Sequence, residues 1–213
     1  DRGYYVHCLD NFHCSDANSF PYVSHPNFVF EKFDCSNYYM SKSFNYDGII
    51  HLAGLVGFPA CSASRTASKL MNYDTTKMIT ELADNANCKL IFSSTQSVYG
   101  KVEGLCTEET PENPNSIYGE HKLMAEKIVT SYDKSIALRF ATGFGVSYKQ
   151  RFDTLPNNMT YDAVKNKVLN IYQKDVKRAF ISVNEMANLL IYCLENFDNR
   201  NHSVYNAGSE SLN

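Results

Sequence analysis

The stretch Lys89-Leu90-Ile91-Phe92-Ser93-Ser94-Thr95 predicts a strand that carries hydroxyl side chains at its carboxyl end. A polar loop with two prolines, Thr110–Asn115, comes later, and Ile117–Tyr132 then has the apolar periodicity of a helix. This succession of strand, loop and helix is the repeating unit of a parallel sheet that is covered by helices.

The same alternation continues on both sides of this unit. The expected strands are Tyr4–Leu9, Phe28–Phe33, Asp47–Gly54, Leu90–Ser94, Ile136–Phe140, Val168–Tyr172, Ala179–Val183 and Val204–Ala207. The expected helices are Ser62–Asn87, Ile117–Tyr132 and Asn184–Asn196. The strand at Asp47–Gly54 is apolar on both faces, which is typical of a parallel strand between two layers of helices. The pattern therefore predicts an α/β fold with a doubly wound parallel sheet.

Composition narrows the class of protein. The chain has 213 residues, 44% of them hydrophobic, and a net charge of −3, so neither a nucleic-acid surface nor a membrane surface is indicated. The longest apolar stretch, Ile49–Ala60, is too short to span a bilayer. The seven scattered cysteines do not form a disulfide framework, which favours a reducing, cytoplasmic location.

Polar or small residues end several of the predicted strands. They are Asp10, Asp34, Gly54, Thr95 and Thr142. Because ligands of doubly wound sheets bind at the carboxyl ends of the strands, we expect these residues to converge on one crevice. An acidic residue there can hold a ribose diol and repels a 2′-phosphate, which favours NAD over NADP. The alternative is that Asp10 is an ordinary turn former.

Tyr118 and Lys122 are the candidate proton-transfer pair. A spacing of four residues places both on one face of a helix, where the ammonium is expected to lower the pKa of the tyrosine. The same spacing also occurs at Tyr38/Lys42, Tyr73/Lys77 and Tyr161/Lys165, so it is not informative alone. The selected pair follows a strand that ends in Thr95, whose hydroxyl can orient a substrate oxygen.

Two other chemistries are less well supported by the sequence. His7-Cys8 and His13-Cys14 could suggest zinc, but adjacent residues of a strand point to opposite faces and no second cluster follows, so we expect no metal site. Ser94 with His121 could suggest a hydrolase, but the glycine pattern of a nucleophile elbow does not surround Ser94.

An ordered set of short motifs resembles the extended short-chain dehydrogenases/reductases, the NAD-dependent nucleotide-sugar epimerase/dehydratase family. The motifs are Leu9-Asp10-Asn11, Asp34-Cys35, His51-Leu52-Ala53-Gly54, Asn72 with Thr75-Thr76, Ser93-Ser94-Thr95 with Val98-Tyr99-Gly100, Tyr118-Gly119 with Lys122, Leu138-Arg139-Phe140, Arg178-Ala179-Phe180-Ile181 and Tyr205-Asn206-Ala207-Gly208. The resemblance implies a Rossmann-like domain over residues 1–150. Residues 151–213 would hold part of a substrate-binding region, interleaved with the last elements of the sheet.

The resemblance also implies roles for individual residues. The catalytic residues would be Thr95, Tyr118 and Lys122. The residues that contact NAD would be Asp10, Asn11, Asp34, Cys35, Leu52, Ala53, Gly54, Asn72, Ser93, Tyr118, Lys122 and Phe140. The residues that contact a nucleotide-sugar substrate would be Thr95, Gln96, Thr142, Asn157, Asn158 and Arg178. Arg178 would clamp the nucleotide diphosphate with its bidentate guanidinium; the alternative is an ordinary surface arginine.

The chain also departs from the family pattern. The glycine-rich phosphate loop is not present, and Asp1–Gly3 reads as the end of a helix, so we expect a fragment that lacks segments at both ends and binds NAD poorly. Gln96 and Ser97 replace the acidic residues that follow the threonine in sugar dehydratases, which argues against dehydration. Thr142 stands where many epimerases have an asparagine.

The resulting hypothesis is an NAD-dependent epimerase that acts on a nucleotide-diphosphate sugar through a transient keto-sugar. Two alternatives stay open: a reductase or decarboxylase that uses the same class of substrate, and a non-catalytic protein of the same fold that senses NAD. The resemblance also allows a homodimer that forms through the helices at residues 72–87 and 117–132.

Overall fold

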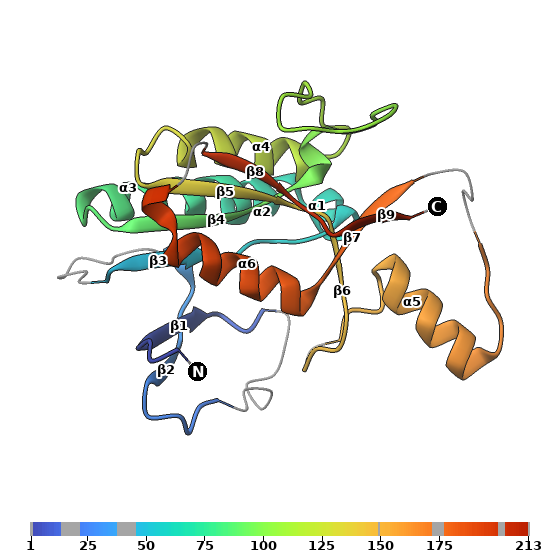
Figure 1. Ribbon diagram of the computed structural model, residues 1–213, viewed down its shortest axis with the longest axis horizontal. Helices are drawn as coiled ribbons and strands as arrows, with labels where there is room; N and C mark the ends of the chain where they lie inside the picture. The colour runs from blue at the N-terminus through green and yellow to red at the C-terminus, as the bar shows by residue number, and fades with distance from the viewer. Residues whose placement is uncertain are drawn as a thin grey trace.

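The computed structural model describes residues 2–13, 22–37, 46–148, 150–171, 177–199 and 203–212 (Figure 1). The strands are β1 (Val6–Asp10), β2 (Phe28–Lys32), β3 (Gly48–His51), β4 (Lys89–Thr95), β5 (Ser135–Phe140), β6 (Thr142–Phe144), β7 (Arg178–Ser182), β8 (Val204–Ala207) and β9 (Glu210–Leu212). The α-helices are α1 (Phe58–Ala63), α2 (Arg65–Lys69), α3 (Thr75–Asn85), α4 (Ile117–Val129), α5 (Leu155–Tyr161) and α6 (Val183–Glu195). Leu70–Asp74 and Asp162–Asn166 are π-helical turns.

The central sheet is parallel and has the strand order β3-β4-β5-β8 in the described part of the chain. Thr95 at the end of β4 lies beside Phe140 at the end of β5, and Phe140 lies beside Ala207 of β8. Within the described ranges, β1 pairs in parallel only with β2, and β6, β7 and β9 form a further small sheet. The carboxyl ends of the central strands therefore meet at one edge.

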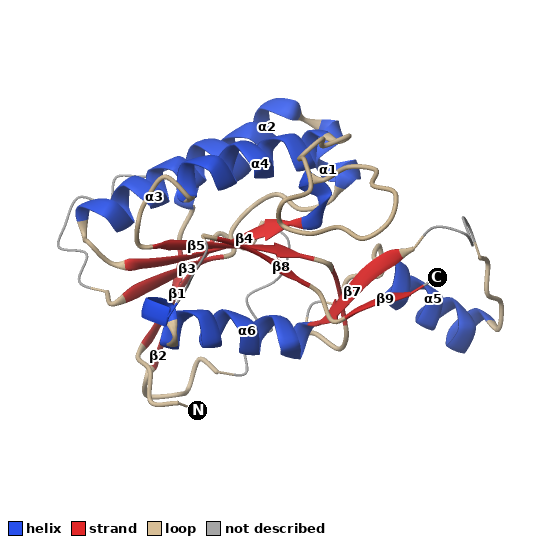
Figure 2. Ribbon diagram, turned by 45° about the horizontal axis from the view of Figure 1, so that its top comes forward, coloured by secondary structure: helices blue, strands red, loops and turns tan. Residues whose placement is uncertain are grey.

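Helices cover both faces of the central sheet. In Figure 2, α2, α3 and α4 lie on one face and α6 lies on the other. Leu90 and Phe92 of β4 point into the core on the α3 and α4 side, whereas Ile91 points into the core on the α6 side. This alternation explains why β4 is apolar at each position of its run. The predicted doubly wound, Rossmann-like fold is confirmed.

The start of α4 is fixed against the end of β4. The Ser116 hydroxyl accepts a hydrogen bond of 3.1 Å from the backbone N–H of Gly119, which caps the helix. A Cβ atom added at Gly119 would lie 2.6 Å from the carbonyl oxygen of Ser97. The first turn of α4 can therefore approach the end of β4 this closely only because residue 119 has no side chain.

Two of the expected elements differ from the structure. The single helix predicted at Ser62–Asn87 begins earlier, at Phe58, and is divided into α1, α2, a π-helical turn and α3. The strand predicted at Val168–Tyr172 is wrong for residues 168–171, which are irregular and exposed, and Tyr172 lies outside the described residues. The apolar pattern predicted a strand, but a strand also needs a partner, and no neighbouring strand pairs with these described residues. The described helices include none with the length and apolarity that a membrane span requires.

Candidate active site

Thr95 and Tyr118 are brought together where β4 ends and α4 begins. Thr95 is buried and is the last residue of β4, and Tyr118 is in the first turn of α4. A hydrogen bond between their side chains lowers the pKa of Tyr118. The Thr95 hydroxyl also accepts a bond of 3.2 Å from the backbone N–H of Ser97, which fixes its position. The two predicted catalytic hydroxyls therefore lie on the same side of the sheet.

The electrostatic state of Tyr118 differs from the expectation. Burial raises its pKa to about 12, an effect that outweighs the opposing effects of Thr95 and of the Arg151 guanidinium. Lys122 does not contribute to a lowering of this pKa. The prediction that the Lys122 ammonium lowers the pKa of Tyr118 is therefore wrong, and burial favours the protonated form of the phenol.

Lys122 lies one helical turn beyond Tyr118 and is also buried. Its Nζ atom lies 4.0 Å from the centre of the Phe92 ring, a cation–π contact. Burial lowers the pKa of Lys122 to about 7, although the Glu126 carboxylate opposes this change. Nearby, burial and the charge of Lys122 lower the pKa of His51 to about 3, and His51 is bonded at 3.0 Å to the Thr76 hydroxyl.

Gly54 and Asn72 form a close contact at the end of β3. A Cβ atom added at Gly54 would lie 2.6 Å from Oδ1 of Asn72. Asn72 is buried, and its Nδ2 donates a hydrogen bond of 2.9 Å to the carbonyl oxygen of Leu55. Its Oδ1 atom accepts no hydrogen bond from the described residues. The contact therefore contains a buried acceptor that has no partner among the described residues.

The acidic residues predicted to hold the adenosine ribose lie at the ends of β1 and β2. Asp10 is exposed, and one of its carboxylate oxygens accepts the backbone N–H of Phe12 at 2.8 Å. Asn11 donates a bond of 3.2 Å to Asp34. Hydrogen bonds from Ser36 hold the pKa of Asp34 below its usual range. Cys35 follows and is half-buried, and burial raises the pKa of its thiol.

The other predicted cofactor contacts line the carboxyl ends of the central strands. Leu52, which follows β3, has 56% of its surface exposed, and Ala53 beside it is exposed too. Ser93 is half-buried near the end of β4, and Phe140 is buried at the end of β5. An exposed leucine at this edge offers apolar surface that a bound ring system can cover.

Gln96 and Thr142 follow the ends of the two central strands β4 and β5. Gln96 is half-buried directly after Thr95, and Thr142 begins β6. A Cβ atom added at Gly208 would lie 3.3 Å from Ala141, 3.4 Å from Nε2 of Gln96 and 3.7 Å from Ala179. The glycine therefore allows the start of β7, where Arg178 is exposed, to pack beside the end of β4.

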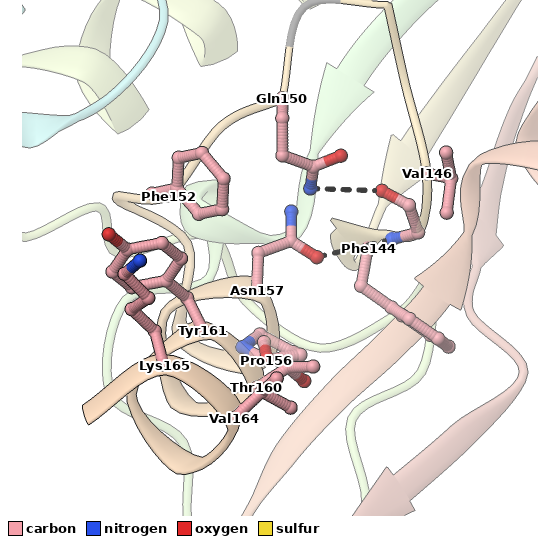
Figure 3. Close-up of a pocket in the computed structure, with 11 residues that line it drawn as sticks. Phe144, Val146, Gln150, Phe152, Pro156, Asn157, Thr160, Tyr161, Val164 and Lys165 are labelled. Carbon is pink, nitrogen blue, oxygen red and sulfur yellow. Dashed lines mark hydrogen bonds between the residues drawn. The ribbon is translucent and has the colours of Figure 1, made fainter. Parts of the chain in front are cut away.

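Asn157 holds the loop that follows β6 rather than standing free for a ligand. Its Oδ1 accepts the backbone N–H of Gly145 at 3.3 Å, and its Nδ2 donates a 2.9 Å bond to the carbonyl oxygen of Arg151. Figure 3 shows Asn157 at the centre of a cavity of about 500 Å³, with Phe152 on one side and Phe144 on the other. Asn158, the next residue of α5, is exposed.

Arg151 is a site residue that the sequence analysis did not identify. Its positive charge lowers the pKa of Tyr118, and its Nη2 lies 3.4 Å from the position of a Cβ atom added at Gly57. Two bonds to Asp153, of 3.0 and 2.5 Å, orient the guanidinium. No pattern in the sequence links this loop to Tyr118, because the contact depends on the position of β6 relative to α4.

The competing motifs do not form comparable sites. Lys69, not Lys77, lies over the Tyr73 ring, at 4.9 Å. Tyr161 and Lys165 line the cavity beside α5. The Tyr38/Lys42 pair lies outside the described residues.

The hydrogen-bond partners of the hydrolase and zinc candidates also differ from those that hydrolysis or zinc binding would need. Ser94 donates to Glu126 at 2.5 Å, whereas the buried His121 is bonded to the Ser68 hydroxyl at 2.8 Å, so the two do not form a hydrolase dyad. The His7 ring is bonded to Tyr46 and, at 3.1 Å, to Glu31, and Cys14 lies outside the described residues.

The order of these residues along the chain agrees with that of a known family. A family model described as the NAD dependent epimerase/dehydratase family matches residues 1–208. The chain belongs to this family. The resemblance predicted from the motifs is thereby confirmed.

Curated members of the epimerase/dehydratase family that match are sugar epimerases by name. UDP-glucose 4-epimerase 4 of Oryza sativa subsp. japonica is 35% identical over 93 residues, which are 41% of this chain and 24% of that protein. Putative UDP-arabinose 4-epimerase 2 of Arabidopsis thaliana is 26% identical over 194 residues, which are 77% of this chain and 46% of that protein. The chain spans between 22% and 56% of the length of the curated relatives that were aligned with it.

Solved structures of family members superpose on nearly the whole chain. UDP-N-acetylglucosamine 4-epimerase from Methanobrevibacter ruminantium M1, in complex with UDP-N-acetylmuramic acid, has a TM-score of 0.86 and 25% identity; the match covers 98% of this chain and 70% of that one. UDP-glucuronic acid 4-epimerase from Bacillus cereus, in complex with NAD, has a TM-score of 0.84 and 25% identity, over 99% of this chain and 71% of that one.

The crevice of this family member has features that suit the family's cofactor, NAD. The Gly54–Asn72 contact leaves the end of β3 without a side chain and provides a buried acceptor for an N–H or O–H group. The carboxylate of Asp10 at the end of β1 suits a ribose diol. Leu52, directly after β3, provides exposed apolar surface. The residues present therefore fit the cofactor.

Proposed function

We propose that this chain forms the catalytic region of an NAD-dependent 4-epimerase that acts on nucleotide-diphosphate sugars. The observation that carries the proposal is the hydrogen-bonded pair of Thr95 and Tyr118 at the carboxyl end of β4, with the buried Lys122 one turn along α4. Membership of the epimerase/dehydratase family and the similarity to UDP-sugar 4-epimerases support the class of substrate.

In the proposed reaction Tyr118 takes the proton of a sugar hydroxyl while a hydride leaves the carbon that bears this hydroxyl. That carbon then becomes a carbonyl. When bound, oxidised NAD supplies the hydride acceptor and a positive charge that favours the phenolate form of Tyr118. The keto-sugar then turns and receives the hydride on its other face, and Tyr118 returns the proton. Oxidation and reduction cancel, so neither the cofactor nor the sugar is consumed.

The neighbours of Tyr118 have separate tasks in this mechanism. The Thr95 hydroxyl orients the substrate oxygen, which brings the reacting proton within reach of Tyr118. Lys122 is proposed to contact NAD through its ammonium group. The residues proposed to contact NAD are Asp10, Asn11, Asp34, Cys35, Leu52, Ala53, Gly54, Asn72, Ser93 and Phe140. The residues proposed to contact the substrate are Gln96, Thr142, Asn157, Asn158 and Arg178.

The decisive experiment follows a set of UDP-sugars by NMR in the presence of the protein and NAD. Epimerisation yields the 4-epimer with no net change in NADH, whereas reduction or decarboxylation yields a different product. Tyr118→Phe should abolish turnover and leave NAD binding intact, because only the phenolic hydroxyl group is lost. Tyr73→Phe, which belongs to a competing motif, is the matched control and should retain full activity. Unchanged turnover in Tyr118→Phe would overturn the assignment.

We also propose that the protein forms a homodimer through the helices at residues 72–87 and 117–132. The support is the arrangement of α3 and α4, which lie together on one face of the sheet (Figure 2). Met124 of α4, with 40% of its surface exposed, is an apolar residue on the outside of this layer.

A further inference from the structure

A buried group of charged residues lies next to Lys122 and has no role in the reaction described above. The Glu126 carboxylate accepts a hydrogen bond of 2.6 Å from Nη2 of Arg139 and one of 2.5 Å from the Ser94 hydroxyl. The Arg139 guanidinium also donates to Glu112 at 2.7 Å and to the Tyr99 hydroxyl at 2.7 Å. The side chains of Glu126 and Arg139 are each only 3% exposed.

Glu126 is on the same side of α4 as the two catalytic candidates. Tyr118, Lys122 and Glu126 follow one another at intervals of four residues, so they lie on successive turns of one helical face. Lys122 and Glu126 are buried, with only 5% and 2% of their surface exposed. Both oxygens of Glu126 are occupied by Arg139 and Ser94, so the carboxylate acts on Lys122 through its charge rather than through a direct hydrogen bond.

The charges of this group balance only when Lys122 is protonated. Arg139 carries one positive charge, whereas its carboxylate partners, Glu112 and Glu126, carry two negative charges. The surplus negative charge is shared between the partly exposed Glu112 and the buried Glu126, and its buried part is costly to leave unbalanced. Lys122 itself forms no ion pair or hydrogen bond with the residues that the structure describes, so its ammonium is the cation that completes the balance.

The other groups around Lys122 act on its charge less than Glu126 does. Phe92 of β4 contributes the face of its ring, at 4.0 Å. His51 of β3 is neutral, since its pKa is about 3, and Tyr118 of α4 is neutral as well, since its pKa is about 12. Cys61 in α1 also raises the pKa of Lys122, by less than Glu126 does. The Glu126 carboxylate is thus the main group that opposes the effect of burial on Lys122.

We propose that Glu126, held by Arg139 and Ser94, is a positioning residue that maintains the positive charge of Lys122 inside the active site. The importance of Glu126 for catalysis rests on the proposed function of Lys122. The effect of the Glu126 charge on the protonation of Lys122 does not depend on that function. If Glu126 served only to neutralise Arg139, its loss would lower the stability of the fold and leave the protonation of Lys122 unchanged. These two roles therefore predict different titrations.

The test is a pH titration of the lysine side chains by NMR, on protein labelled with ¹³C at the lysine Cε. The signal of Lys122 is assigned by its loss in Lys122→Met, and in the wild type we expect it to titrate near pH 7, well below ordinary lysines. In Glu126→Gln the midpoint should fall by about one pH unit or more, because a buried opposite charge one helical turn away shifts a pKa by about that amount. No substrate or cofactor is needed.

The matched control is Glu120→Gln, which removes a carboxylate from the same helix at a partly exposed position paired with Arg65. It should leave the midpoint of Lys122 unchanged, because solvent screens this charge. Glu112→Gln is the second variant, since Glu112 is partly exposed and its loss is tolerated more easily by the fold. It should move the midpoint in the same direction as Glu126→Gln, by a smaller amount.

The outcomes separate the proposals. An unchanged Lys122 midpoint in a folded Glu126→Gln variant overturns the inference. If that variant does not fold, Glu112→Gln decides: a lowered midpoint supports the inference, and an unchanged one overturns it. A lowered midpoint in a protein that does not epimerise any UDP-sugar would support the coupling and contradict the proposed function.

Discussion

At the scale of single residues, the site combines two groups whose protonation is set by burial. Tyr118 has a pKa raised to about 12 and Lys122 has a pKa lowered to about 7, so burial favours the neutral form of each. The proposed reaction needs the opposite forms, a phenolate and an ammonium. Charges near the site, and not the Tyr–Lys spacing alone, therefore determine whether the pair is active.

The buried Lys122 should make stability depend on pH. Between about pH 7 and pH 10 this lysine is mostly deprotonated in the folded chain and protonated in the unfolded chain, so the unfolded state binds more protons and stability rises with pH. Relative to Lys122→Met, the wild type should gain up to about 4 kcal/mol in free energy of unfolding across this range. Urea denaturation of both proteins at several pH values measures the difference. A constant difference would contradict the lowered pKa.

Removal of the Thr95 hydroxyl should affect both the rate and its pH dependence. Thr95→Ala deletes the hydrogen bond that lowers the pKa of Tyr118, so this pKa rises further. We expect turnover to fall by about tenfold to a hundredfold and the profile of kcat against pH to move to higher pH. Thr95→Ser keeps the hydroxyl and should retain the wild-type profile. Identical profiles for the two variants would show that the hydroxyl has no such role.

At the scale of secondary-structure elements, the end of β3 and the π-helical turn before α3 form a close contact. The Gly54→Ala change would place a Cβ atom 2.6 Å from Oδ1 of Asn72. We expect a loss of about 1–3 kcal/mol in free energy of unfolding, because a packed site cannot accept the methyl group, together with weaker NAD binding. Calorimetry measures both quantities.

The paired variant Gly54→Ala/Asn72→Ala separates the steric effect from other causes. Since Asn72→Ala removes the atom that the new methyl group would strike, Gly54→Ala should cost less stability in the Asn72→Ala background than in the wild type. Equal costs of Gly54→Ala in the two backgrounds would mean that the contact is not the cause.

The β4–α4 unit could be predicted from the sequence because its signals are local. An apolar run that ends in hydroxyl residues predicts the strand, and the apolar periodicity of Ile117–Tyr132 predicts the helix. The strand expected at Val168–Tyr172 had a local signal too, but a strand also needs a partner, which residues 168–171 lack within the described chain.

The parts of the site that could not be predicted depend on distant segments. Arg151 reaches the surroundings of Tyr118 from the loop after β6, and the pKa of Tyr118 depends on how completely the fold buries it. The charge balance around Lys122 likewise joins α4 to β5 and to the loop at Glu112. The roles of the individual site residues are therefore predictions that variants must test.

At the scale of the whole molecule, the proposed dimer predicts a measurable change in mass. Met124→Glu places a charge on the exposed surface of α4, where an apolar contact between two copies would exclude it. Light scattering should give a dimeric mass for the wild type and for Met124→Leu, and a monomeric mass for Met124→Glu. A monomeric wild type would end the proposal.

One helix carries Tyr118, Lys122 and Glu126, and its first turn is fixed to β4 by the cap at Ser116 and by the absence of a side chain at Gly119. The backbone positions of these three residues cannot move relative to one another without bending α4. In the proposed reaction the sugar must present both of its faces, so the rotation belongs entirely to the substrate. The backbone of α4 then stays in place during the reaction. The space in which the keto-sugar can turn determines whether both of its faces can receive the hydride.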